Sequence, residues 1–154
     1  MLPFRKIIAP TDFSGPSRFG VSAAAELAEA YSAELILIYT VPRMPFVPAP
    51  HGAGAAGQVA LEQDIRESAQ NALNDWIEKE IPAEVAGRYR VLSGDPAGQI
   101  VQAAAEEDAD LIVIATHGET GWRRFVSGSV AEKVVRLADC PVLTVHSPPP
   151  SEEE

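Results

Sequence analysis

The sequence predicts one α/β domain, doubly wound on a single open, five-stranded parallel sheet. Short apolar runs alternate with longer amphipathic stretches, which is the pattern of successive β-α-β units. Most of the apolar runs carry Ile, Val or Leu at consecutive positions, as strands do when helices cover both faces of a sheet. The chain has 154 residues, enough for one domain with its own core, so no second domain is expected.

Five segments are predicted as strands from their aliphatic composition and short length. The third of them is the most mixed in composition, so we expect it near an edge of the sheet. In chain order the predicted strands are Arg5–Pro10, Glu34–Tyr39, Arg88–Leu92, Asp110–Ala115 and Pro141–Val145.

Helical patterns fill the intervals between the predicted strands. Ser14 is placed to cap the first helix, and Asp95 followed by Pro96 suits the cap and first turn of the third. Trp76 is expected in the core beneath the second helix. The predicted helices are Pro16–Tyr31, Leu61–Glu80, Pro96–Glu107 and Val130–Ala138.

The fourth helix has a capping-box pattern at its start, formed by Ser129 and Glu132. Helical periodicity places four of its apolar residues on one face, which we expect to pack on the sheet. These residues are Val130, Val134, Val135 and Ala138.

Two segments lack a regular pattern. Pro42–Gly57 is rich in Pro, Gly and Ala, which predicts a loop between the second strand and the second helix. Such a loop is either inert or a lid over a site, and the sequence leaves both open. Ser147–Glu154 combines three prolines with three terminal glutamates and is expected to be a disordered acidic tail beyond a domain spanning residues 1–146.

Composition excludes several classes of function. The net charge of -10 would repel a phosphate backbone, so no nucleic-acid partner is expected. No apolar run approaches the length of a membrane span, and residues 1–10 lack a signal-peptide pattern, so a cytoplasmic protein is expected. Cys140 is the single cysteine, which rules out an internal disulfide and a C-x-x-C metal site.

Candidate binding residues follow the first and fourth predicted strands. The first strand leads into Pro10-Thr11-Asp12, and the fourth leads into Ala115-Thr116-His117-Gly118; nine residues later comes Gly128-Ser129 at a helix start. Glycines allow close backbone approach, and a helix N-terminus presents free N–H groups to an anion. The segment is neither a Walker A loop nor a dinucleotide fingerprint, because it has no GK[ST] and does not follow the first strand.

These segments resemble the universal stress protein family, and the resemblance runs from Phe4 to Val145. The family's first strand and loop are similar to Lys6–Ser14, and its later landmarks are similar to Gly94-Asp95-Pro96 and Pro141–Val145. Its nucleotide-binding branch carries G-x-x-G-x9-G-[ST], in which Ala115 replaces the first glycine here. The resemblance implies an adenine-nucleotide α-hydrolase-like sheet of strand order 3-2-1-4-5, with its ligand at the reversal point between strands one and four.

The resemblance also implies a ligand and its contacts. The ligand would be ATP, with AMP and ADP as further candidates and Mg²⁺ as the accompanying ion. Asp12 would approach the ribose or adenine, Pro10 and Thr11 would shape the base pocket, and Thr40 would offer backbone groups to the adenine. Position 115 would lie close to the nucleotide, and the phosphates would be held by Gly118, Gly128, Ser129 and Val130.

Other interpretations of these residues stay open. Asp12 could cap a turn or the first helix instead of binding a ligand. Arg123 and Arg124 either neutralise the phosphates or are solvated surface charges. A nucleotide-independent dimeric interaction module of the same fold is the alternative function. An adenylating enzyme is disfavoured because the S-G-G-x-D-S loop of the related α-hydrolases is absent.

The sequence indicates a binding protein more than an enzyme. It shows no general base and no carboxylate pair for a metal, so at most slow ATP hydrolysis or self-phosphorylation is expected in a stress-response regulator. The resemblance further implies a homodimer in which Pro141–Val145 pairs with its copy in a second subunit. An apolar strand at a sheet edge is a template for such pairing.

Overall fold

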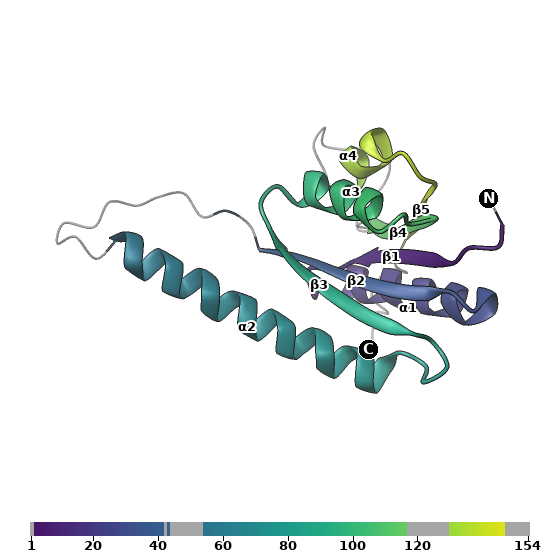
Figure 1. The fold of residues 1–154 in the computed structure, drawn as a ribbon, viewed down its shortest axis with the longest axis horizontal. Coiled ribbons are helices and arrows are strands. Elements are labelled where there is room, and N and C mark those ends of the chain that lie inside the picture. Colours follow the sequence, from purple (N-terminus) through teal and green to yellow (C-terminus); the bar gives the residue numbers. More distant parts are fainter. Residues whose placement is uncertain (1, 42, 44–53, 117–129, 147–154) are drawn as a thin grey trace, which may run out of the picture.

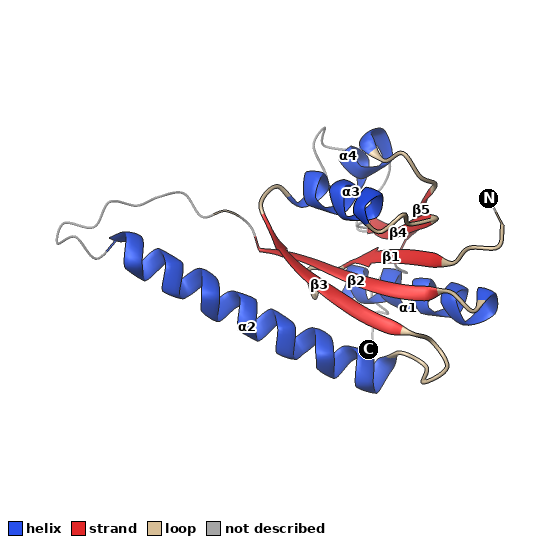
Figure 2. Ribbon diagram, viewed as in Figure 1, coloured by secondary structure: helices blue, strands red, loops and turns tan. Residues whose placement is uncertain are grey.

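The computed structural model describes residues 2–41, 43, 54–116 and 130–146. Strands and helices alternate along these residues, as Figures 1 and 2 show. The strands are β1 (Lys6–Pro10), β2 (Glu34–Val41), β3 (Gly87–Ser93), β4 (Leu111–Thr116) and β5 (Val142–His146). The helices are α1 (Gly15–Tyr31), α2 (Gly54–Glu80), α3 (Pro96–Glu106) and α4 (Val130–Leu137).

The strands form one parallel sheet in the order β3-β2-β1-β4-β5. This confirms the predicted α/β class, the predicted strand order and the position of the third strand at an edge. β1 and β4 lie side by side because the chain starts in the middle of the sheet and winds outward in both directions (Figure 1). Open sheets bind ligands beyond the carboxyl ends of the two strands at such a reversal point.

Helices cover both faces of the sheet. Side chains of alternate parity in each inner strand point to opposite faces, so Leu35 and Leu37 pack with α1 and α2, whereas Ile36 and Ile38 pack with α3 and α4. Trp76 is buried in the first of these two cores, as expected. The sheet is therefore the middle layer between two layers of helices.

The predicted caps of α1 and α3 are confirmed. Ser14 accepts a hydrogen bond from the backbone N–H of Ser17, and Asp95 accepts one from the N–H of Gly98, with a proline in the first turn of each helix. Each cap lies at the carboxyl edge of the sheet, because each helix follows a strand directly. The caps thus fix how the chain leaves that edge.

Three predicted details are wrong. The second strand was expected to end at Tyr39 but runs to Val41, so Thr40 lies within β2. Residues 54–57 belong to α2 and not to the predicted loop, because the alanines among them are strong helix formers. In α4, Val134 is buried, but two other residues of the predicted face are exposed: Val130 at 39%, in the first turn, and Val135 at 51%, about 100° around the helix from Val134.

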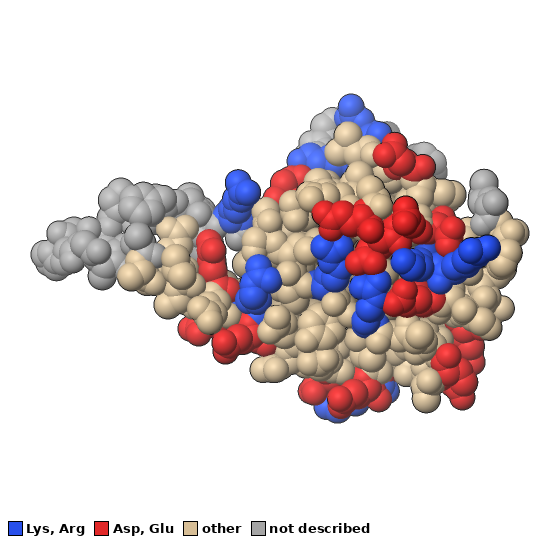
Figure 3. All heavy atoms as spheres, viewed as in Figure 1, with Lys and Arg blue, Asp and Glu red and all other residues tan. Residues whose placement is uncertain are grey.

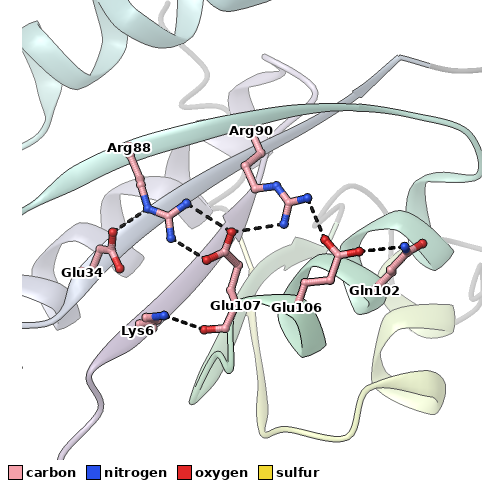
Figure 4. A network of polar contacts seen from close by, with 7 residues as sticks. All are labelled: Lys6, Glu34, Arg88, Arg90, Gln102, Glu106 and Glu107. Atoms are coloured by element: carbon pink, nitrogen blue, oxygen red, sulfur yellow. Dashed lines mark hydrogen bonds and ion pairs between the residues drawn. The ribbon is translucent and has the colours of Figure 1, made fainter.

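An ion-pair network lies at the opposite edge of the sheet, near the amino ends of its strands (Figure 4). Arg88 of β3 bonds to Glu34 of β2 and to Glu107 at the end of α3, and Glu107 also bonds to Arg90. Acidic and basic side chains consequently alternate on this face (Figure 3), although the whole chain is strongly acidic. The network ties β2, β3 and α3 together on the side away from the candidate site.

Candidate functional site

The loop after β1 is fixed by hydrogen bonds within itself. Thr11 donates its backbone N–H to the carbonyl oxygen of Ile38 at 2.8 Å, which keeps the loop beside β2. The Thr11 hydroxyl lies 3.0 Å from the Ser17 hydroxyl and accepts the N–H of Phe13 at 2.9 Å. Because Thr11 is only 7% exposed and its hydroxyl is engaged in these contacts, its side chain fixes the shape of the loop.

Asp12 is presented outward by this loop. Its Oδ1 accepts the backbone N–H of Ser14 at 3.0 Å, and the residue is exposed. Partial burial acts to raise the pKa of Asp12, but hydrogen bonds from Ser14 and Ser17 outweigh burial and hold that pKa below its ordinary value. Asp12 is therefore a fixed carboxylate near neutral pH, able to accept hydrogen bonds from hydroxyl or amino groups.

Phe13 anchors the loop in the core, a role that sequence reasoning missed. Its backbone adopts φ of 65°, a left-handed conformation that is rare for a bulky residue. The ring packs against Tyr39 of β2 at 5.0 Å between centroids and against Trp76 of α2 at 6.0 Å. These contacts hold a strained turn in place, and the direction of the neighbouring Asp12 follows from it.

Thr40 lies in β2 two residues beyond Ile38, near the carboxyl edge of the sheet. By alternation its side chain lies on the face covered by α3 and α4. Its hydroxyl oxygen is buried and has no hydrogen-bond partner in the part of the chain that the structure describes. The role expected of Thr40 concerned its backbone, so this unpaired hydroxyl is a new feature of the site.

Ala115 directs its methyl group away from that face. It has the parity of Leu111 and Val113, which pack toward α1 and α2. A Cβ placed on Gly20 of α1 would stand 3.1 Å from the Ala115 Cβ. The methyl that replaces the first glycine of the signature thus lies against α1, on the side of the sheet opposite to α4.

The amino end of α4 completes the described part of the site. Val130, the first residue of α4, is 39% exposed, and α4 packs on the same face as α3. Lys133 of α4 lies 3.9 Å from the cap residue Asp95 of α3. The remaining predicted contact residues lie outside the described residues; these are Gly118, Arg123, Arg124, Gly128 and Ser129.

The described groups suit binding of a small polar molecule. They offer a carboxylate at Asp12, an unpaired hydroxyl at Thr40 and a helix start at Val130. Within the described ranges no cluster of three or more His, Cys, Asp or Glu could hold a metal ion, and no helix has the length and apolar character to cross a bilayer. Two shallow hollows, of about 440 and 350 Å³, lie elsewhere, beside Asp110 and beside Arg66.

A sequence model described as the universal stress protein family matches residues 3–146. A universal stress protein of Methanocaldococcus jannaschii is 38% identical to this chain over 146 residues, which are 94% of this chain and 84% of that protein. The match to the family model therefore spans all five strands and four helices described above.

Solved structures show the same fold. The structure of the hypothetical protein MJ0577 superposes with a TM-score of 0.78 at 25% identity, over 95% of this chain and 98% of that one. A universal stress protein from Archaeoglobus fulgidus, in complex with dAMP, superposes with a TM-score of 0.55 at 24% identity, over 94% and 98%. That relative holds an adenine nucleotide in its structure.

Proposed function

Because this chain belongs to the universal stress protein family, we propose that it is a cytoplasmic stress-response regulator that binds ATP at the carboxyl edge of its sheet. The observation that carries the proposal is the side-by-side position of β1 and β4 at the reversal of strand order. The loop bearing Asp12 leaves one of these strands, and the glycine signature follows the other. Both flank the place where open α/β sheets bind their ligands.

The described residues fit an adenosine moiety. The Asp12 carboxylate can accept hydrogen bonds from ribose hydroxyls, and its charge is kept by the hydrogen bonds from Ser14. Pro10 and Thr11 would shape the base pocket, and the backbone of Thr11 is held beside β2 by its hydrogen bond to Ile38. Thr40 lies on the α3 and α4 face, where the base would rest.

The phosphates are proposed to lie across β1 from Thr40. Gly118, Gly128 and Ser129 would offer backbone N–H groups to them, together with the first turn of α4 at Val130. Arg123 and Arg124 would reduce the phosphate charge on this acidic chain, and AMP or ADP would use the same base and ribose contacts. Mg²⁺ would bind through the phosphate oxygens, with waters completing its shell.

A homodimer through β5 is part of the proposal. β5 is the outer strand of the described sheet and pairs with β4 on one side. Its Leu143 is 42% exposed, and α4 exposes Val135 at 51% and Leu137 at 57%. Pairing of Pro141–Val145 with a second copy would cover an apolar strand edge that otherwise invites aggregation.

Native mass spectrometry of the chain purified without added nucleotide tests both parts. The expected result is a dimer that retains adenine nucleotide or takes up one ATP per subunit when ATP is added. A chain that takes up no adenine nucleotide at millimolar ATP contradicts the nucleotide site, and a monomer at all concentrations contradicts the dimer. Each part of the proposal can therefore fail separately.

The exposed apolar residues beside β5 favour a second candidate function, a dimeric interaction module that needs no nucleotide. This alternative expects the same dimer by native mass spectrometry but no mass increase with ATP. Slow ATP hydrolysis, if the first function holds, would appear as ADP accumulating over hours in the same samples. The mass of the bound ligand thus separates the two functions.

A further inference from the structure

An arginine of α2 reaches the backbone of β3 on the side that faces away from β2, here called the outer side of β3. β3 is an end strand of the described sheet, and α2 lies alongside it (Figure 1). The Arg66 guanidinium group donates one hydrogen bond to the backbone carbonyl oxygen of Val91 and another to the Ser93 hydroxyl, both at 2.7 Å. A backbone acceptor of an end strand is thus taken up by a side chain.

The carbonyl group of Val91 is one that an added strand would need. Backbone groups of successive strand residues point alternately to the two sides of the strand. Just before β3, the carbonyl oxygen of Ala86 accepts the N–H of Leu35 in β2. Just after β3, the N–H of Gly94 donates to the carbonyl oxygen of Val41 in β2. Even-numbered positions therefore face β2, and Val91 faces the outer side, where a further strand would pair.

Solvent lies beyond the guanidinium group. Ser93 is exposed, and a hollow of about 350 Å³ lies beside Arg66 and Ser93. A second contact between α2 and β3 runs from the Asn74 amide to the Tyr89 hydroxyl at 3.2 Å, but it joins two side chains and takes up no backbone group. Removing the guanidinium group would therefore leave the carbonyl group of Val91 facing solvent.

The two end strands of the described sheet differ in how they meet solvent. β5 carries no Lys, Arg, Asp or Glu and exposes Leu143 at 42%. β3 carries Arg88 and Arg90, and Arg66 of α2 adds a third arginine at its outer side. Charged side chains at an end strand oppose pairing with another chain. A sheet that could pair at both ends would build open chains of subunits, whereas one closed end limits the assembly.

We propose that Arg66 closes the outer side of β3 to strand pairing, so that a second copy of this chain cannot add there. An incoming strand would have to displace two hydrogen bonds made by a charged group, which are stronger than those between neutral groups. Without the guanidinium group, β3 pairs with β3 of a second copy. The inference concerns assembly alone and does not depend on the nucleotide site.

Sedimentation velocity over a concentration series tests the closure on the full-length chain. Arg66→Ala should form species of at least twice the wild-type mass, with an association constant for this step about tenfold or more above that of the wild type. Arg66→Gln, which is uncharged and shorter than arginine, should associate in the same way. Arg66→Lys keeps the charge and a donor, so it should stay within about threefold of the wild type.

Lys79→Ala is the matched control. It removes one positive charge from an exposed position of the same helix, where Lys79 pairs only with Asp75 among the contacts given by the described residues. Lys79→Ala should keep the wild-type mass. Alanine and glutamine are both good helix formers, so α2 should persist in all these variants, and circular dichroism checks that it does.

Hydrogen exchange locates the new contact. In Arg66→Ala, amide exchange of residues 87–93 should slow as the protein concentration rises, and it should not do so in the wild type. Wild-type mass of Arg66→Ala and Arg66→Gln at every concentration would overturn the inference. Larger species without slower exchange in residues 87–93, or equal association of Lys79→Ala, would overturn it as well.

This inference and the proposed dimer through β5 fail in different results. If the wild type is a monomer at all concentrations, the β5 dimer is wrong, but Arg66→Ala should still form dimers through β3. If the wild type is a dimer and Arg66→Ala has the same mass, the β5 dimer stands and only the closure of β3 is refuted.

Discussion

The methyl group of Ala115 in β4 lies directly against Gly20 of α1. A Cβ added to Gly20 would stand 3.1 Å from both the Cβ and the backbone nitrogen of Ala115, closer than side chains normally pack. The alanine that departs from the glycine signature therefore takes up space that a glycine in α1 leaves free. This contact explains how β4 accommodates the methyl without directing it toward the proposed ligand.

Gly20→Ala should destabilise the protein by about 1–2 kcal/mol. The overpacking cost of about 1–3 kcal/mol exceeds the gain of up to about 1 kcal/mol from replacing glycine within a helix. Ala115→Gly, which makes room for the new methyl, should recover part of that loss in the double variant. Urea unfolding of the two single variants and the double variant gives the coupling energy. Strictly additive effects would contradict the contact.

Asp12→Asn should weaken ATP binding by about five- to twentyfold while leaving the fold intact. The amide oxygen of Asn can still accept the Ser14 N–H, so the turn is preserved, but the charge-assisted hydrogen bonds to ribose become weaker. Calorimetric titration with ATP measures the affinity, and circular dichroism on heating checks the fold. Unchanged ATP affinity would support the open alternative that Asp12 only caps the turn.

Phe13→Ala should lower both stability and nucleotide affinity. The ring contacts with Tyr39 and Trp76 are lost, which we expect to cost about 2–4 kcal/mol, and the turn that positions Asp12 loses its anchor. Phe13→Leu, which restores apolar volume, should recover part of the stability. Affinity is measured under conditions where each variant is fully folded. A wild-type ATP affinity in folded Phe13→Ala would show that the anchor does not position Asp12.

Stability should fall as the pH drops below about 4.5. The hydrogen bond from Arg88 lowers the pKa of Glu107, and backbone N–H groups of Arg5 and Lys6 lower the pKa of Asp110. A folded-state pKa below the unfolded one means that the unfolded chain binds more protons in acid. The stabilisation is therefore complete above the unfolded pKa of about 4 and is lost as pH falls through the folded pKa.

Unfolding temperatures measured from pH 7 to pH 3 check this dependence. Glu107→Gln should reduce the slope between pH 5 and pH 3, because one of the responsible carboxylates is gone. Glu78→Gln removes the same charge from an exposed position on α2 and is the matched control. Equal slopes in the wild type and both variants would show that the Arg88 contact does not govern acid stability.

The sequence predicted the fold well because local patterns agree with the tertiary arrangement. The aliphatic runs became the strands, and Ser14 and Asp95 cap their helices as expected. The start of α2 was misjudged because residues 54–57 mix glycine, typical of loops, with alanine, typical of helices. Composition alone cannot decide between these tendencies when the helix continues into a packed segment.

The site was predicted less completely than the fold. The residues after β1 and β4 could be identified, but side-chain direction depends on which helices cover which face of the sheet. The methyl of Ala115 and the unpaired hydroxyl of Thr40 are consequences of that layering. The anchoring role of Phe13 depends on Trp76, more than sixty positions along the chain, and no local pattern signals that contact.

A crystal structure of the chain grown with excess ATP and magnesium tests the central claim most directly. The account predicts one nucleotide per subunit beyond the carboxyl ends of β1 and β4, with its base at Thr40, its ribose at Asp12 and its phosphates at the start of α4. An empty carboxyl edge, or a nucleotide bound only at the Arg88 network on the amino edge, would contradict it.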